Sequence, residues 1–296
     1  MNKQSFFKDA GRSVFLRRAA WLFGLPAMAI FIFCLVAGFQ LTRAQTDDEN
    51  KPAADSALTA ARDDDDDEVD ECNRRSGPIV QLPTTKLFIE YNATNEDTGI
   101  HGDFVGLGWK KLCIYDPRGR LILEFKPQNQ LKRLLGMDGV RFESREPPIA
   151  EVPVATILAQ FPEGRYSVRG LTFDGRRIRG GATFTHAIPE APEITYPADE
   201  ATIPRLNQVF TWLPVTQTIF GGPLQTTAYQ VIITKDVPDD PNGFSRPTLD
   251  IIVPATQTSL SIPGDFLQPN TRYELEVLAL EVSGNQTISI IHFRTQ

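Results

Sequence analysis

Histidine, cysteine, methionine and tryptophan are scarce in this 296-residue chain, with three residues of each. Short catalytic motifs are missing as well. There is no His-Glu-x-x-His zinc motif, no Gly-x-Ser-x-Gly elbow, no Gly-x-Gly-x-x-Gly turn and no phosphate-binding loop. These absences argue against an enzyme that works through a known motif. We therefore expect a non-catalytic protein that needs no cofactor.

Proline and glycine are plentiful instead, with 22 and 21 residues, which suits a loop-rich all-β chain. Alternating apolar and polar residues predict strands in the first half at residues 86–91, 111–115, 121–125, 140–144, 166–173 and 178–186. Residues 154–161 are evenly apolar, so a short helix and a strand both remain open there. Residues 128–136 are compatible with one or two helical turns.

The clearest strand signal begins at Tyr273, which follows Leu-Gln-Pro-Asn-Thr-Arg and precedes an alternation of apolar residues. A tyrosine in this position can hydrogen-bond the preceding turn while its ring closes one end of a sandwich core. A weaker copy of the pattern surrounds Tyr166. Both strands end in a glycine turn, at Asp174-Gly175 and at Ser283-Gly284. The spacing of the two copies suits one sandwich domain of ~100 residues for each.

Residues 192–296 resemble a fibronectin type III domain. The resemblance rests on Trp212 in Val-Phe-Thr-Trp, on Tyr229 in Ala-Tyr-Gln-Val-Ile-Ile, and on the corner formed by Leu267 and Tyr273. It implies a β-sandwich core that contains these four residues, and Tyr166 would take the corner position in the preceding domain. The polar stretch at residues 237–247 departs from the pattern. No Arg-Gly-Asp tripeptide is present, so integrin-type binding is not implied.

The N-terminal residues predict export. Basic residues dominate residues 1–18, residues 19–41 carry no charge, and Thr42-Arg43-Ala44 offers small residues at a cleavage site. A cleaved signal peptide and an uncleaved anchor through residues 19–41 both remain open. Residues 46–71 then hold twelve acids and two bases, with continuous acid at residues 63–68. We interpret this stretch as a disordered, solvated spacer, and a site for cations or a basic partner is the alternative.

We therefore predict an all-β protein with two tandem immunoglobulin-like or fibronectin type III-like β-sandwiches. The predicted boundaries place a signal peptide or signal-anchor at residues 1–44, an acidic linker at 45–78, a divergent sandwich at 79–189 and the fibronectin type III-like domain at 190–296. Cys72 and Cys113 remain after the leader, and in an exported chain they can form a disulfide. Two free thiols, with Cys113 buried as a small apolar residue, are the alternative.

One segment suggests a metal site. Residues 92–103 contain several oxygen ligands and two glycines, so Asn95, Glu96, Asp97 and Asp103 are candidate calcium ligands. An ordinary hairpin loop built from turn residues is the alternative. A basic cluster at Arg176, Arg177 and Arg179 lies in the first domain.

The predicted function is recognition or adhesion outside the cytoplasm, in which loops of the sandwiches bind a protein or glycan partner. The alternative is an accessory module of a secreted polysaccharide-degrading system, with or without weak catalytic activity of its own. A net charge of −7 argues against nucleic acid as a ligand. Membrane contact would come only through the N-terminal segment, if that segment is retained.

Overall fold

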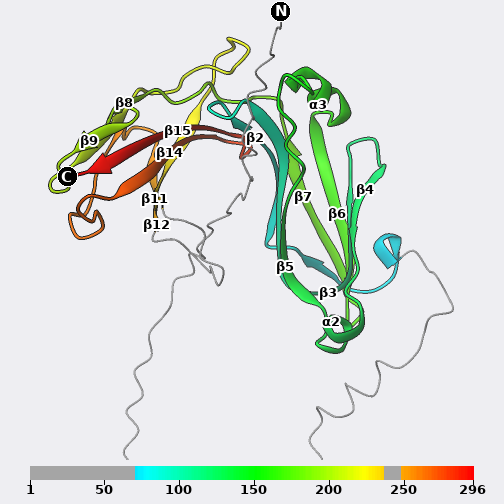
Figure 1. Ribbon diagram of the computed structural model, residues 1–296. Coiled ribbons are helices and arrows are strands. Elements are labelled where there is room, and N and C mark those ends of the chain that lie inside the picture. Colours follow the sequence, from blue (N-terminus) through cyan, green and yellow to red (C-terminus); the bar gives the residue numbers. More distant parts are fainter. Residues whose placement is uncertain (1–70, 237–247) are drawn as a thin grey trace, which may run out of the picture. The chain divides into compact units, whose positions relative to one another are not determined.

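The computed structural model describes residues 71–236 and 248–296, which are mostly β-strand (Figure 1). The predicted leader at residues 1–44, the linker up to residue 70 and the polar stretch at residues 237–247 lie outside the described residues. Among the residues that are described, no helix is long and apolar enough to cross a membrane.

The first sandwich is built around one long strand. Its elements are η1 (Glu71–Asn73), β1 (Ile79–Gln81), β2 (Thr84–Asn92), β3 (Asp97–Tyr115), β4 (Leu121–Phe125), α2 (Asn129–Arg133), β5 (Met137–Glu143), α3 (Val154–Gln160), β6 (Gly164–Thr172) and β7 (Arg177–Phe184). The pairing register of β3 shifts on both sides of Trp109. Such bulges bend a strand, so they divide β3 into two parts. The first part of β3 pairs with β2 and β5, and the second part pairs with β6 and β4. Apolar side chains from both parts enclose the core.

The second sandwich has two sheets that face one core. Its elements are β8 (Ile194–Tyr196), β9 (Ala201–Ile203), β10 (Val209–Trp212), β11 (Thr226–Lys235), β12 (Thr248–Pro254), β13 (Ser259–Ser261), β14 (Arg272–Glu281) and β15 (Gln286–Thr295). One sheet runs β8–β10–β13 and the other β12–β11–β14–β15, with β9 beside the end of β15. The arrangement is that of a fibronectin-like sandwich, so the all-β sandwich prediction is confirmed.

The predicted core residues are buried where the pattern placed them. Trp212 packs edge-on against Tyr229 with ring centroids 5.5 Å apart, and Leu267 is buried. The Tyr273 hydroxyl accepts a hydrogen bond from the Gln268 N–H at 2.7 Å and donates to the Phe266 carbonyl at 3.3 Å. Tyr166 donates to the Pro162 carbonyl at 3.1 Å. Each of the two tyrosines is therefore hydrogen-bonded to the turn that precedes it.

Asn285, at the end of the turn between β14 and β15, is buried against the first sandwich. Asn285 is fully buried, and its Oδ1 accepts a hydrogen bond from the Ile89 N–H at 2.8 Å. Its Nδ2 donates toward the carbonyls of Thr185 and Ala187, at 3.0 and 3.3 Å. Beyond the turn, β15 pairs in parallel with β2. The sequence predicted only a hairpin turn here, because the contacts come from residues far away along the chain.

Both segments for which the sequence allowed a helix contain one. Residues 154–160 form α3, which buries Ile157 and Leu158. Residues 129–133 form α2, which buries no side chain. For residues 154–161 the even apolar pattern suits either a helix or a strand, so here the packing of Ile157 and Leu158 made the choice.

Candidate functional site

The structure does not bring the four predicted calcium ligands together. The prediction of one long loop over residues 92–103 is wrong, because a tight turn at residues 93–96 leads directly into β3 at Asp97. Asn92 supports this turn by accepting hydrogen bonds from the N–H groups of Thr94 and Asn95. Asp103 lies further along β3, roughly 20 Å from Asp97 at ~3.3 Å per residue. It pairs with Arg141 at 3.0 Å.

Two groups of histidine and carboxylate side chains were not predicted from the sequence. The first contains Glu90, His101 and Glu146, and the second contains Asp199, Glu200 and His292. Buried His101 places Nε2 2.9 Å from Glu146 Oε1 in the first group. In the second group, Arg272 binds both oxygens of Glu200, at 2.7 and 2.6 Å. Within each group the atoms that could bind a metal ion lie within 4.8 Å of one another. Each group joins residues that are far apart along the chain, so no sequence spacing could reveal it.

A disulfide shapes the most strongly charged surface of the first sandwich. Cys72 of η1 is bonded to Cys113 of β3, so the predicted pairing is present in the structure. Both cysteines are buried together with Tyr115. The bond holds η1 on the outer face of the sheet, and Arg74 and Arg75 follow it directly. These residues were assigned to the linker, and the structure instead places them against the sandwich.

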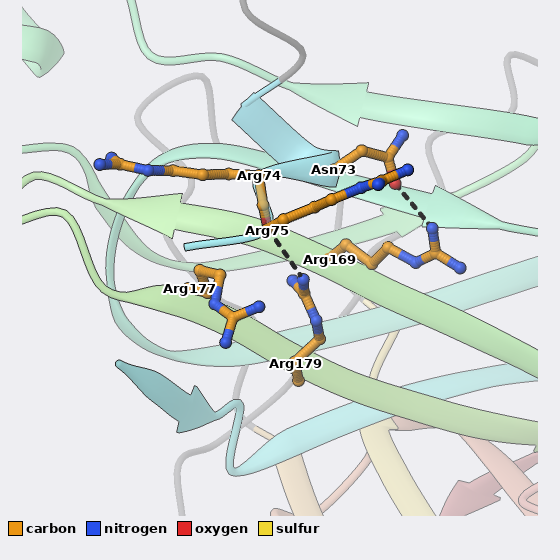
Figure 2. A pocket seen from close by; sticks show the side chains of 6 residues that line it. All are labelled: Asn73, Arg74, Arg75, Arg169, Arg177 and Arg179. Carbon is orange, nitrogen blue, oxygen red and sulfur yellow. Dashed lines mark hydrogen bonds between the residues drawn. The ribbon is translucent and has the colours of Figure 1, made fainter. Parts of the chain in front are cut away.

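Strands β6 and β7 supply three more arginines on the same face. Arg169 of β6 is the register partner of Arg179 of β7, and Arg177 lies two residues before Arg179. Side chains two residues apart on a strand share a face, so the three guanidinium groups project together. With Asn73, Arg74 and Arg75 they line a pocket of about 680 Å³ (Figure 2). We call these six residues the arginine pocket.

Neutral groups hold the arginines in place. Arg169 donates to Asn73 Oδ1 at 2.6 Å and lies over the Tyr115 ring, 4.8 Å from its centroid. Arg177 Nε donates to the Gly77 carbonyl at 2.9 Å, and Arg179 donates to the Ile178 carbonyl at 2.8 Å. Such contacts orient a guanidinium group without neutralising its charge.

The arginine pocket therefore carries a high positive charge. None of the ion pairs among the described residues includes any of its five arginines. The nearby acids serve other cations, since Glu71 pairs with Lys110 and Asp174 with Arg176. Burial, together with the charges of Arg177 and Arg169, lowers the pKa of Arg179. Like charges opposite one another destabilise a sheet, so a bound anion would relieve this repulsion.

Part of the pocket was visible in the sequence. The basic cluster at residues 176–179 contains Arg177 and Arg179, whose spacing on a strand places them on one face. Arg176 points elsewhere and binds Asp174. Arg169 and the pair Arg74-Arg75 join only through strand pairing and the disulfide. Planar guanidinium groups gathered in this way are suited to bind carboxylate, sulfate or phosphate.

Comparisons with known proteins give structural similarity without a family. No family model matches the chain, and no curated protein matches it by sequence. Among solved structures, the FN1–FN3 domains of chicken CNTN1 are 15% identical over 74% of this chain and 65% of that chain, with a TM-score of 0.27. A tetra-tandem repeat from the extending region of a large adhesion protein is 10% identical over 72% of this chain and 50% of that one, with a TM-score of 0.24. These TM-scores are low, so the similarity carries no argument about function.

Proposed function

We propose that this chain is a recognition module that binds an anionic partner in its arginine pocket. The observation that carries the proposal is the gathering of five arginines in one pocket, with no ion pair to any described carboxylate. A binding role agrees with a sandwich scaffold, on which surface loops and strand faces present side chains. The proposal includes no catalytic step.

An exported location supports this role. A buried disulfide between Cys72 and Cys113 persists in oxidising compartments, and the sequence of residues 1–44 predicts export. The partner is then a molecule outside the cytoplasm that carries carboxylate, sulfate or phosphate groups, such as an acidic glycan or an acidic protein surface. Binding of a glycan by stacking of its sugar rings on a flat row of aromatic side chains has little support. Phe220 is the only strongly exposed aromatic side chain among the described residues.

Binding should depend strongly on salt. Exposed and half-buried guanidinium groups gain affinity through Coulomb attraction, which falls as the Debye length shortens from ~10 Å at 0.1 M to ~3 Å at 1 M salt. The planar guanidinium also favours two parallel hydrogen bonds to one oxyanion group. Replacing arginine by lysine in the pocket should therefore retain the part of the affinity that comes from charge. It should lose the part that comes from two parallel hydrogen bonds to one oxyanion group.

The test compares a pocket variant with a matched surface variant. The pocket variant is Arg169→Gln with Arg179→Gln. The control is Arg118→Gln with Arg133→Gln, which removes the same charge from exposed positions of the same sandwich outside the pocket. Dextran sulfate and polygalacturonate serve as sulfate and carboxylate probes in fluorescence titrations between 50 and 500 mM NaCl. We expect the pocket variant to lose at least tenfold in affinity for one of the probes and the control to lose less than threefold. Equal losses in both variants would refute the proposal.

A further inference from the structure

One histidine and two glutamates meet in the interior of the first sandwich. Glu90 lies on β2, His101 on β3, and Glu146 in the segment that follows β5. Their side chains are 11%, 8% and 4% exposed, respectively. The Nε2 atom of His101 lies 2.9 Å from Glu146 Oε1 and 3.8 Å from Glu90 Oε1. We call these three residues the His101 cluster.

Strand pairing and one glycine bring the cluster together. Gly99 is opposite Glu90 in the register of β2 with β3, and His101 lies two residues further along the same face. The Glu146 side chain takes the space above Gly99, where an added Cβ would lie 2.5 Å from Glu146 Cγ. A larger residue at position 99 would therefore push Glu146 away from His101.

The backbone that carries Glu146 is fixed on both sides. The Ser144 N–H donates to the Ile100 carbonyl at 2.9 Å, and the Ile149 N–H donates to the Glu96 carbonyl at 2.8 Å. Both acceptors belong to the β2–β3 hairpin, which also carries the other two members of the cluster. The three side chains are therefore held in place before any ligand binds.

The Glu90 carboxylate is oriented from the second sandwich. Gln286 of β15 is buried, and its Nε2 donates to Glu90 Oε2. The other oxygen of Glu90 then faces His101. Carboxylates that bind metal ions are commonly held by a hydrogen bond of this kind, which fixes the binding oxygen in position.

Charge favours a divalent cation at the cluster. Two ionised carboxylates beside one histidine leave at least one net negative charge, whether or not the imidazole is protonated. Buried charge is costly unless an opposite charge compensates it. A divalent cation bound by two carboxylates and a neutral imidazole brings the sum to zero.

The distances suit the same interpretation. Around a tetrahedral zinc ion with bonds of about 2.0–2.2 Å, neighbouring ligand atoms lie roughly 3.3 Å apart. The two distances from His101 Nε2, 2.9 and 3.8 Å, fall on either side of this value. Small side-chain movements are therefore enough to admit the ion.

We propose that Glu90, His101 and Glu146 bind one zinc ion, each through one atom, with water as the fourth ligand. Imidazole nitrogen suits zinc, whereas calcium and magnesium take oxygen ligands. The ion would join β2, β3 and the segment after β5, next to the place where β2 pairs with β15. None of the three residues lines the arginine pocket, so this site is independent of the proposed function.

The second histidine group provides a matched control. The His292 side chain is 33% exposed, and both oxygens of Glu200 are bound by Arg272. Asp199 Oδ1 accepts a hydrogen bond from the His292 N–H at 2.9 Å. These exposed carboxylates already have strong donors, so we expect no zinc to be retained there.

The first test measures the zinc content of the refolded chain. The full, unreduced chain is unfolded in urea, refolded with zinc chloride, desalted and analysed by mass spectrometry for metals. The variants are Glu146→Gln, which keeps the size of the side chain and an acceptor for His101 but removes the charge, and the control His292→Ala. We expect the unmodified chain and the control to retain about one zinc ion per chain more than Glu146→Gln. All three proteins keep the acidic residues 63–68, so zinc bound there cancels in the comparison.

The second test measures stability and checks that the variants fold. Urea midpoints are compared in EDTA and in zinc chloride. A ligand that binds only the folded state stabilises it, so zinc should raise the midpoints of the unmodified chain and of His292→Ala. The midpoint of Glu146→Gln should not change with zinc. Calcium chloride at the same concentration should raise none of them.

Equal zinc content in the unmodified chain and in Glu146→Gln would overturn the inference, and so would midpoints that zinc leaves unchanged. If Glu146→Gln does not fold in EDTA, His101→Gln replaces it and must lose zinc in the same way. Dextran sulfate binding tests the arginine pocket separately, so either proposal can fail without the other.

Discussion

Replacement of Asn285 by alanine should destabilise the protein more than any surface substitution. The Asn285 side chain is fully buried. Its Oδ1 accepts from the Ile89 N–H, and its Nδ2 donates toward two carbonyls, those of Thr185 and Ala187. Alanine would leave one buried donor and two carbonyl groups without this partner. A buried polar group that loses its partner costs about 1–3 kcal/mol, and water can reach part of the space that is opened. We therefore expect a loss of roughly 3 kcal/mol.

Urea denaturation followed by tryptophan fluorescence measures this change, since Trp109 and Trp212 report on the first and second sandwich. The matched control is Asn95→Ala in the exposed part of the β2–β3 turn, for which we expect less than about 0.5 kcal/mol. Because Asn285 joins the two sandwiches, the variant should also separate their unfolding into two transitions. A loss below 1 kcal/mol with a single transition would refute the description of the Asn285 side chain as a buried connection.

Four further predictions concern stability and covalent structure. Tyr273→Phe should cost about 1 kcal/mol, because the Gln268 N–H loses its acceptor, and Trp212→Ala should cost about 3–5 kcal/mol by opening a core cavity. Unchanged urea midpoints would contradict both. Burial, with the charges of Glu274, Glu90 and Asp250, raises the pKa of Glu276 to about 8, above its ordinary value of 4.5. The folded state therefore keeps a proton that the unfolded state releases, and stability falls as the pH rises from about 4.5 to 8. Glu276→Gln should remove this slope and stabilise the half-buried site at pH 8 by on the order of 1–3 kcal/mol, and an unchanged slope in urea melts would count against this explanation. Thiol titration of the exported, denatured and unreduced protein should find no free cysteine; one thiol would mark retention of Cys34, and two or more would argue against the Cys72–Cys113 bond.

The sequence by itself determined the architecture of the second sandwich. Apolar alternation after Tyr273 and the aromatic pair Trp212 and Tyr229 depend on neighbours within one strand or one turn, so their positions are visible in a local pattern. The same holds for β4, whose predicted and observed bounds coincide at Leu121–Phe125. Local periodicity is enough where a residue only has to choose between the core and the solvent.

Only the tertiary structure decided the site. The predicted calcium loop became a hairpin turn and a strand, because β3 already begins at Asp97 and pairs with β2 and β5 on its two sides. The arginine pocket draws on residues about a hundred positions apart, and the disulfide and the register of β6 with β7 bring Arg74 and Arg169 to one face. Asn285 looked like an ordinary turn residue until its partners, contributed by the first sandwich, became visible. Sequence patterns record which way a side chain faces, whereas the partners it meets depend on strand register and cross-links between distant segments.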